Sequence, residues 1–406
     1  MSLLLAALVL LAAPEDPRLL ERARALLVQA PLIDTHNDLP SMLVEKLRGD
    51  LSQLDFGKPQ PALCADLPRM RQGGLGAQYW SVFVDSANAK THTSLHEALR
   101  EFDAVLRLIE SRPETELART AADIERIHKA GKLASLIGVE GGHMIEGSPE
   151  VLRIFSRLGA GYLTLTHWDS IEWADSATDR AVSDGLSKKG EQLVGELNRL
   201  GMFADLSHVS AETMRDVLRV TRAPVIFSHS NAFAVDPHPR NVPDDVLLLL
   251  KANGGVVHVN FLRDFVTPTQ VAWNEQKKAA KRALRATVAT DEAVEAAEKQ
   301  WEKDHPAPLA TIAQVADHID HLRQVAGIDA IGIGADFFDV DPLPLVDGLG
   351  DVSRYPALFA ELLRRGYSDE EVLKIAGRNH LRAMRAVERV AEELRKSSPP
   401  LVLPGK

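Results

Sequence analysis

The sequence predicts a (β/α)8 barrel, in which eight parallel strands are surrounded by helices. Three observations predict this class: eight short apolar runs, helical patterns between most of them, and chemically capable polar residues at the ends of six runs. A doubly wound open sheet would show the same local alternation of strands and helices. It would spread the six polar residues along one edge, whereas a barrel gathers the carboxyl ends of its strands in one ring. We therefore expect a barrel.

The predicted strands are apolar runs of five to eight residues. They lie at 32–36, 77–84, 134–140, 162–167, 202–208, 224–229, 255–261 and 330–336. The polar residues that end six of these runs are His36, Glu140, His167, His208, His229 and Asp336.

Amphipathic patterns between the runs predict the helices. The clearest patterns lie at 189–200, between Pro243 and Asn253, and at 312–325. In the first of these, Leu193, Val194 and Leu197 fall on one face, as expected for a helix that packs on a core. Each pattern is followed within two residues by a glycine, which is a favourable stop because it adopts the left-handed conformation easily.

Composition excludes several classes of protein. The chain has 406 residues, 45% of them hydrophobic and 26% charged, so collagen-like, low-complexity and mostly disordered chains are excluded. A net charge of -10 argues against a sequence-independent nucleic-acid binder, which needs a basic face. Cys64 is the single cysteine, which excludes an intramolecular disulfide and a cysteine-rich zinc site.

The expected domain organisation is one barrel domain over 17–396, with an apolar segment at 1–16 and a flexible tail at 397–406. A charged, alanine-rich insertion at about 267–308 should form two helices after the seventh strand. Because it leaves that strand at its carboxyl end, it should emerge on the face that carries the polar residues. Trp273 and Trp301 need partners, so we expect these helices to pack beside the barrel mouth, narrow access to it and offer a contact for a homodimer.

The apolar run from Leu3 to Ala13 bears on the compartment. It is too short for a transmembrane span, which needs about 20 residues. It fits the apolar region of a secretory signal, which would make the protein periplasmic or secreted. The alternative is an apolar helix docked on the body of a cytoplasmic protein. Nothing later in the sequence resembles a membrane span.

Five side chains form a candidate metal centre. His36 and Asp38 are two residues apart in an extended segment, so both point to the same side. Alone, this pair has a plainer interpretation, a histidine hydrogen-bonded at a strand end. Glu140 ends an apolar run, and His208 and His229 end consecutive strands. Together they supply two sites that share Glu140, and two ions about 3.5–4 Å apart can hold a hydroxide and polarise a carbonyl.

Three further residues are candidates for catalysis or substrate binding. Asp336, which faces the metals without completing their coordination, is a candidate proton shuttle; the alternative is a helix N-cap. His167 is a candidate donor to an oxyanion, or a residue that only supports the site by a hydrogen bond. Arg240, in a loop after the sixth strand, suits a substrate carboxylate; the alternative is a surface ion pair.

Seven motifs follow one another from about Leu32 to about Val387. They are 34–40 (DTHNDLP), 137–143 (IGVEGGH), 162–167 (YLTLTH), 205–210 (DLSHVS), 223–230 (APVIFSHS), 240–245 (RNVPDD) and 314–318 (QVADH). In order, spacing and chemistry they resemble the membrane (renal) dipeptidase family, peptidase family M19, a branch of the metal-dependent amidohydrolase superfamily.

The resemblance implies a zinc-dependent dipeptidase on a (β/α)8 barrel, with two zinc ions per chain and small dipeptides as substrates. It implies that Glu140 bridges the ions, with His36 and Asp38 completing one site and His208 and His229 the other. By the same resemblance His167 contacts the substrate carbonyl, Arg240 grips its C-terminal carboxylate, and Asp336 is the acid and base. The family accepts a D-residue at the C-terminal position and some members open β-lactams, so a related amidohydrolase activity on another carboxylate-bearing amide is the alternative.

The chain departs from the animal members of this family near the predicted mouth. Those enzymes carry a tyrosine after the Asn-Phe that ends strand seven, whereas Leu262 stands there in this chain. The charged insertion is also absent from them. Both departures concern substrate preference rather than the metal chemistry.

Overall fold

Nine parallel strands in the described part of the chain form one sheet, and eight of them close into a barrel. The computed structural model describes residues 16–287, 290–338 and 344–403. The strands are β1 (Leu32–Asp34), β2 (Leu75–Phe83), β3 (Thr115–Leu117), β4 (Leu133–Glu140), β5 (Ala160–Thr164), β6 (Phe203–Asp205), β7 (Ile226–Phe227), β8 (Val256–Val259) and β9 (Ile331–Ile333). Their order is β2-β1-β9-β8-β7-β6-β5-β4-β3, and the pairing of β2 with β4 closes the ring. The predicted fold class is confirmed.

The eight predicted runs coincide with the barrel strands, but most strands end earlier than predicted. Where the predicted runs end at His36 and His229, backbone N–H groups bond to side chains instead of to the neighbouring strand. After Phe227, for example, the Ser228 N–H donates to Asp205 Oδ1 at 2.8 Å. β3 was not predicted. It has three residues, of which only Thr115 is buried, and its sequence shows no alternation of apolar and polar residues. It pairs with the amino half of β4, outside the ring.

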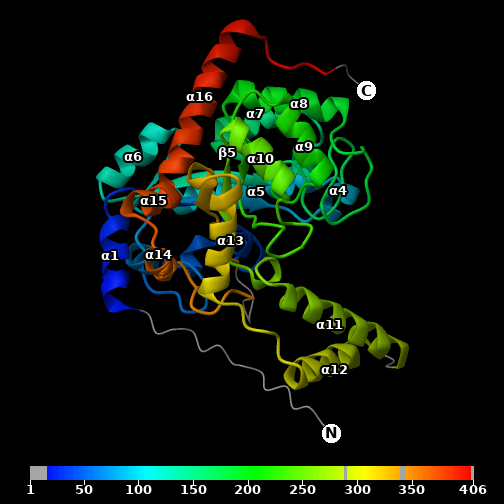
Figure 1. The fold of residues 1–406 in the computed structure, drawn as a ribbon. Coiled ribbons are helices and arrows are strands. Elements are labelled where there is room, and N and C mark those ends of the chain that lie inside the picture. The colour runs from blue at the N-terminus through cyan, green and yellow to red at the C-terminus, as the bar shows by residue number, and fades with distance from the viewer. Residues whose placement is uncertain (1–15, 288–289, 339–343, 404–406) are drawn as a thin grey trace.

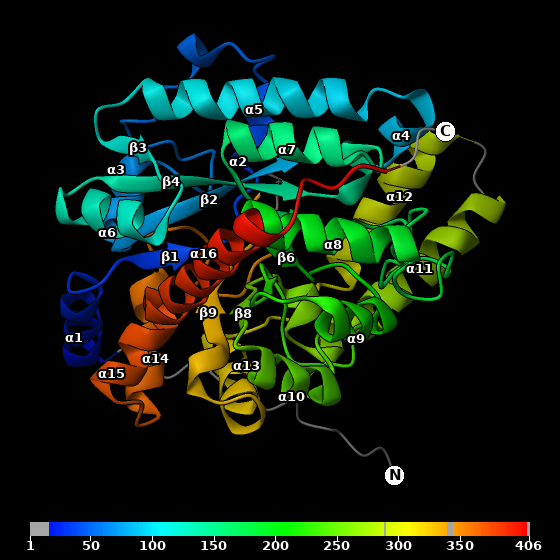
Figure 2. The same ribbon diagram turned by 90° about the horizontal axis from the view of Figure 1, so that it is seen from above.

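Helices surround the barrel (Figures 1 and 2). They are α1 (Pro17–Leu27), α2 (Leu39–Glu45), α3 (Leu67–Gln72), α4 (Ala87–Thr91), α5 (Ser94–Glu110), α6 (Ala121–Lys129), α7 (Pro149–Leu158), α8 (Lys188–Leu200), α9 (Ala211–Val220), α10 (Asp244–Asn253), α13 (Ile312–Val325), α14 (Tyr355–Arg364), α15 (Asp369–Leu373) and α16 (Asn379–Ser397). The short turns are η1 (Leu51–Gln53), η2 (Gly142–Ile145), η3 (Arg263–Phe265), η4 (Ile328–Ala330) and η5 (Lys374–Arg378). Gly201 and Gly254 end α8 and α10 with φ of 80° and 78°, as their sequence positions predict.

The amino-terminal end of the barrel is closed by α16, which crosses it in Figure 2. Leu381 and Met384 of this helix join one buried cluster with inward-facing side chains of the strands. His380 adds polar contacts, with Nε2 2.9 Å from the Tyr79 hydroxyl and Nδ1 3.1 Å from His258 Nε2. The barrel interior is thus filled at this end, whereas the predicted site residues lie at the carboxyl ends of the strands.

The insertion forms two helices, α11 (Pro268–Thr287) and α12 (Asp291–Asp304), which project from the barrel as a hairpin (Figure 1). The rings of Trp273 and Trp301 lie 5.7 Å apart, and Trp273 Nε1 donates to the His305 carbonyl at 2.7 Å. The two tryptophans thus have their partners inside the hairpin and not on the barrel. The start of α11 is held to η3, where Asn274 Nδ2 donates to Asp264 Oδ1 at 2.7 Å.

The tail after α16 turns back onto the body. Arg153 donates to the Leu401 carbonyl at 2.9 Å, and the Leu401 N–H donates to Glu196 Oε2 at 3.1 Å. Within the described residues, no helix combines the length and apolar character needed to cross a membrane. The apolar run from Leu3 to Ala13 and the last three residues of the tail, 404–406, lie outside those residues.

Candidate active site

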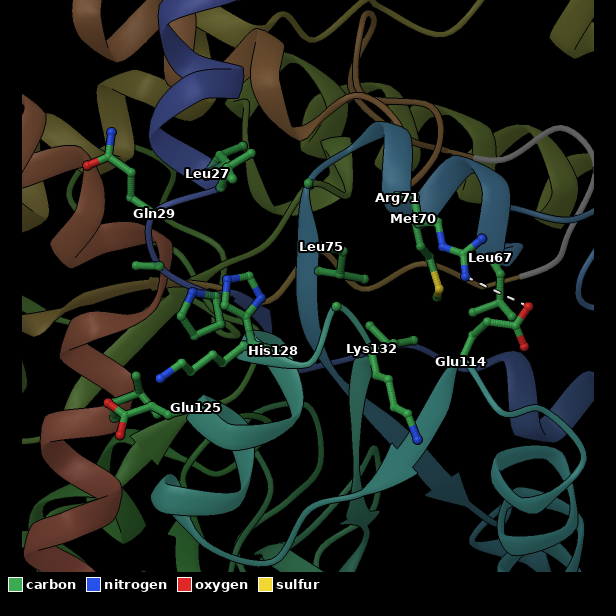
Figure 3. A pocket seen from close by; sticks show the side chains of 18 of the residues that line it. Leu27, Gln29, Leu67, Met70, Arg71, Leu75, Glu114, Glu125, His128 and Lys132 are labelled. Atoms are coloured by element: carbon green, nitrogen blue, oxygen red, sulfur yellow. Dashed lines mark ion pairs between the residues drawn. The ribbon is translucent and has the colours of Figure 1, made fainter.

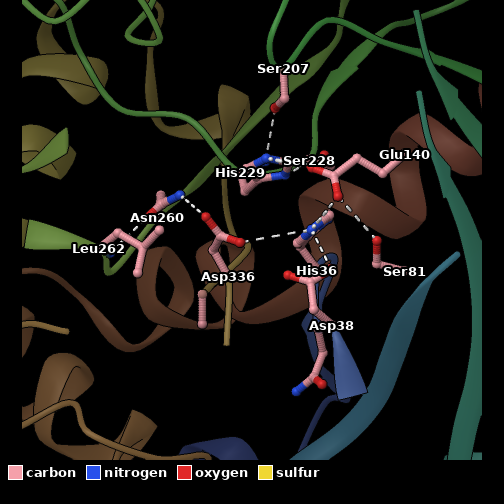
Figure 4. Close-up of polar contacts among 12 residues, drawn as sticks. His36, Asp38, Ser81, Glu140, Ser207, Ser228, His229, Asn260, Leu262 and Asp336 are labelled. Carbon is pink, nitrogen blue, oxygen red and sulfur yellow. Dashed lines mark hydrogen bonds and ion pairs between the residues drawn. The ribbon is translucent and has the colours of Figure 1, made fainter. Parts of the chain in front are cut away.

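The barrel brings the candidate residues to one place because parallel strands end at the same ring. Glu140 is the last residue of β4. The other residues lie a few positions beyond their strands: His36 and Asp38 after β1, His167 after β5, His208 after β6, His229 after β7 and Asp336 after β9. In Figure 4, His36, Glu140, His229 and Asp336 point toward one another.

The Glu140 carboxylate lies between the histidines. Its Oε1 is 3.0 Å from His208 Nε2 and 3.3 Å from His229 Nε2. Its Oε2 is 3.5 Å from His36 Nε2 and accepts a hydrogen bond from Ser81 Oγ at 3.3 Å. The two carboxylate oxygens therefore face different histidines, as a group shared between two cations must do.

His36 is the centre of a second group of side chains. Its Nε2 is 3.3 Å from Asp38 Oδ1 and 3.7 Å from Asp336 Oδ1. The side chains form three overlapping groups in which the potential ligand atoms all lie within 4.8 Å of one another. The groups are His36, Glu140 and His229; Glu140, His167 and His208; and His36, Asp38 and Asp336.

The donor atoms fit divalent cations better than they fit one another. The Nε2 atoms of His208 and His229 are 3.0 Å apart, and both face Glu140 Oε1. At most one of the two nitrogens can donate a hydrogen to the other, whereas a cation could accept the lone pairs of both. His36 Nε2 and Asp38 Oδ1 are buried, and neither has a hydrogen-bond partner among the described residues. Buried polar atoms are normally satisfied. Nitrogen and oxygen donors that converge in this way are typical of zinc ligands.

Two of these residues have unusual backbone conformations. His208 has φ of 70° and Asp336 has φ of 65°, in the left-handed region that only a few per cent of non-glycine residues adopt. Such strain persists where the surrounding structure imposes it, and it is found most often at functional sites. Here the left-handed conformation occurs just after β6 and β9, at the two residues whose side chains enter the site.

Asp205, which the sequence analysis did not single out, organises the loops that carry His208 and His229. Its Oδ1 accepts from the N–H groups of Ser207 at 3.1 Å and Ser228 at 2.8 Å. Its Oδ2 accepts from Ser228 Oγ and Thr164 Oγ1, both at 2.5 Å. A carboxylate at the end of an apolar strand, three residues before a candidate ligand, was the available sequence signal.

Asp336 is buried beside the other carboxylates. Burial raises its pKa to about 7, and the nearby charges of Asp38 and Glu140 act in the same direction. Asn260 Nδ2 donates to Asp336 Oδ2 at 2.7 Å, which leaves Oδ1 directed at His36 (Figure 4). Both carboxylate oxygens of Asp336 thus face side chains of the site. Cations bound beside it would favour its ionised form.

Arg240 lies inside the site and is only 2% exposed, which excludes the surface ion pair. Its guanidinium carbon lies 5.7 Å from the ring centre of Trp168 and 5.0 Å from that of Phe265. One NH2 group donates to the His229 carbonyl at 3.4 Å, while Nε is buried without a partner among the described residues. Burial lowers the pKa of Arg240 to about 10, so it stays cationic at neutral pH.

His167 is held by ring contacts. Its ring centre is 4.5 Å from that of Phe83 and 4.3 Å from that of His208. Its Nε2 is 3.8 Å from Glu140 Oε1, beyond hydrogen-bond range. Burial lowers the pKa of His167 well below its usual value, so the ring is neutral.

A cavity of about 310 Å³ opens onto these residues. The polar residues that line it are Asp38, Ser41, Glu45, Lys46, Glu140, His167, His208, Arg240 and Asp336, and the apolar ones are Met42, Phe83, Trp168, Leu262, Phe265 and Phe338. Leu262, which replaces the tyrosine of the animal enzymes, therefore lies on the cavity wall.

A larger cavity, of about 870 Å³, lies at the opposite end of the barrel beside the start of β2 (Figure 3). Two of its cationic side chains are already paired, Arg71 with Glu114 at 3.8 Å and Lys132 with Glu116 at 3.6 Å. It is separated from the candidate metal ligands by the length of the barrel interior, and we assign it no part in the chemistry.

A buried group of histidines and carboxylates at the carboxyl end of a (β/α)8 barrel defines a class, the metal-dependent hydrolases. Comparison of the sequence with known families narrows this class. The profile of the family described as membrane dipeptidase (peptidase family M19) matches residues 20–398. The chain belongs to this family and is a metal-dependent dipeptidase.

One relative and one solved structure agree with this assignment, and a second solved structure shares the fold. The chain is 40% identical to human Dipeptidase 3 over 400 residues, which cover 96% of this chain and 72% of that protein. The crystal structure of the probable dipeptidase PvdM from Pseudomonas aeruginosa has a TM-score of 0.81 at 23% identity, covering 93% of this chain and all of that one. Dipeptidase AC, a metallopeptidase of family M19, has a TM-score of 0.70 at 25% identity, covering 88% of this chain and 98% of that one.

The Asp205 contacts lead to a stability prediction. Asp205→Asn should lower the free energy of unfolding by about 1–3 kcal/mol, because the amide nitrogen cannot accept the hydrogen bonds that the carboxylate accepts. Chemical denaturation measures this change. Asp103→Asn is the matched control, since this exposed carboxylate forms a surface ion pair with Arg107 and should change stability by no more than about 0.5 kcal/mol. Equal effects of the two substitutions would contradict the role given to Asp205.

Proposed function

We propose that the chain binds two zinc ions, which share Glu140. His36 and Asp38 would complete one site, and His208 and His229 the other. The observation that carries this proposal is the position of Glu140, whose Oε1 lies within 3.3 Å of His208 Nε2 and His229 Nε2 while its Oε2 faces His36 Nε2 at 3.5 Å. Histidine and carboxylate ligands favour zinc among the common metals.

The proposed reaction is hydrolysis of the peptide bond of a dipeptide. Bound zinc supplies a Lewis acid and lowers the pKa of water, so that a nucleophile is available at neutral pH. Asp336 Oδ1, which is free of the Asn260 hydrogen bond, would take the proton of the attacking water and deliver it to the leaving amine. His167, a neutral imidazole at the edge of the cavity, would donate a hydrogen bond to the developing oxyanion.

Arg240 would select the substrate. Its buried guanidinium has an unpartnered Nε and lines the cavity, which suits the C-terminal carboxylate of a dipeptide. The cavity of about 310 Å³ is small for a longer peptide. As in the family, the C-terminal residue could be D-configured. Hydrolysis of another amide or of a β-lactam is not favoured, since the curated relatives are dipeptidases.

The metal count is the first prediction of this proposal. The purified protein should contain about two zinc ions per chain by elemental analysis, and Glu140→Gln should lose both metal and activity because the side chain serves both sites. Glu150→Gln, the same change at an exposed ion pair with Arg153, should keep both ions. Active enzyme with one ion or none would exclude a dinuclear centre.

The second prediction concerns proton transfer. Asp336→Asn should keep its zinc and lower kcat by about 10²–10⁴-fold, the range expected for removal of a general acid and base, with a smaller change in KM. Steady-state kinetics together with elemental analysis separates this outcome from metal loss. A variant that turns over near the wild-type rate would remove Asp336 from the mechanism.

The third prediction concerns the substrate carboxylate. Amidation of a dipeptide at its C-terminus should lower kcat/KM by about 10–150-fold, since a charge-assisted hydrogen bond contributes about 1.5–3 kcal/mol. Arg240→Ala should erase the difference between acid and amide. Lys46→Ala, at the rim of the same cavity, is the control and should preserve it. Equal wild-type rates on acid and amide would rule out this role.

A further inference from the structure

We infer that Tyr162 is a positioning residue for the candidate metal ligand His36, holding its imidazole in the tautomer that leaves Nε2 free to bind a cation. The inference rests on the proposed function, because it assumes that His36 binds metal. Tyr162 is in β5, is fully buried and lies beneath the site rather than in the cavity.

Two contacts define the position of the Tyr162 hydroxyl. It donates a hydrogen bond to the Thr35 carbonyl at 3.1 Å. It also lies 3.1 Å from His36 Nδ1. Both partners belong to the segment that follows β1, so one hydroxyl on β5 ties the strand that carries His36 to a strand across the barrel interior.

The direction of the protons follows from the chemistry of these groups. A carbonyl oxygen can only accept, and a phenol has a single hydrogen to donate. If that hydrogen goes to the Thr35 carbonyl, the phenol oxygen must accept from His36 Nδ1–H. A neutral imidazole with its proton on Nδ1 has its lone pair on Nε2, the atom that faces Asp38 and Glu140. The hydroxyl therefore selects the tautomer that metal binding requires.

Burial keeps this arrangement intact. Tyr162 is fully buried, so the two contacts of its hydroxyl are shielded from solvent. Gly138 on the neighbouring strand β4 makes room for it, since a Cβ at that position would overlap the end of the Tyr162 ring. The ring packs on Tyr79, with centres 5.4 Å apart.

The other two histidines have different supports. His229 Nδ1 lies 2.9 Å from Ser228 Oγ, which in turn donates to the buried carboxylate of Asp205. His208 Nδ1 has no hydrogen-bond partner among the described residues. Of these three histidines, His36 is the one whose Nδ1 contacts an uncharged tyrosine hydroxyl. Removing it should weaken the site of His36 and Asp38 and spare the site of His208 and His229.

The test is zinc affinity of the whole chain, measured by competition with a chromophoric chelator. Tyr162→Phe keeps the ring and removes the hydroxyl. It should weaken one of two zinc-binding steps by about 10–100-fold, as is typical when a hydrogen bond to a ligating histidine is lost, and leave the other unchanged. Tyr79→Phe is the matched control: it removes a buried hydroxyl that contacts His380, 2.9 Å away, which is not a candidate ligand. It should leave both steps unchanged.

A second measurement is made on the wild-type protein. In zinc-loaded wild-type protein with labelled histidine, nitrogen NMR should find His36 protonated at Nδ1, with the signal assigned through its loss in His36→Gln. A His36 Nδ1 without a proton would overturn the inference. So would unchanged zinc affinities in folded Tyr162→Phe, or an equal loss in Tyr79→Phe. A wild-type protein that binds one zinc ion, weakened by Tyr162→Phe, would keep the inference and overturn the dinuclear proposal; a protein that binds no zinc would overturn both.

Discussion

Burial of the Glu140 carboxylate is the constraint on which the rest of the site depends. An ionised carboxylate taken out of water is costly unless a cation or several hydrogen-bond donors face it. Glu140 is 4% exposed, and Ser81 is the hydroxyl that donates to it. Burial raises the pKa of Glu140 and lowers those of His208 and His229 well below their usual values, which favours neutral imidazoles at these two positions. At His36 burial also acts to lower the pKa, but the neighbouring Tyr162, Glu140 and Asp38 raise it well above its usual value. Neutral imidazoles and a carboxylate are the forms in which these groups bind metal.

The supports of the three histidines give this centre its rigidity. The loops after β6 and β7 are joined by Asp205, and the segment after β1 is joined to β5 by Tyr162. These contacts come from strands that are distant in sequence and adjacent or opposite in the barrel. Below them, α16 fills the other end of the barrel and places His380 against Tyr79 and His258. The candidate metal ligands thus lie above a packed and hydrogen-bonded layer of side chains, which suits a site that must hold its geometry.

The mouth of the barrel is more apolar than this hydrogen-bonded layer. Arg240 brings a buried positive charge into a wall made largely of aromatic and aliphatic side chains, including Trp168 and Phe265. The α11–α12 hairpin begins next to this wall, at η3, and then leaves the barrel as a self-supported unit built on Trp273 and Trp301. The candidate substrate-binding residue Arg240 therefore lies in a loop, whereas Asp205 and Tyr162, which support the candidate metal ligands, lie in strands.

The sequence by itself determined the fold class and the identity of the family. Periodic apolar runs that end in polar residues require a barrel to bring those residues together, and the motifs around His36, Glu140, His208 and His229 agree with one family in order and spacing. Both are local signals, repeated along the chain. Tertiary structure alone decided the contacts that have no local signal. The buried position of Arg240, the role of Asp205 between two loops, and the contact of Tyr162 with His36 across 126 positions depend on strands packed side by side. The tryptophans of the hairpin show the same limit, because a sequence reveals that an apolar side chain needs a partner, whereas only the packed chain shows which partner it has.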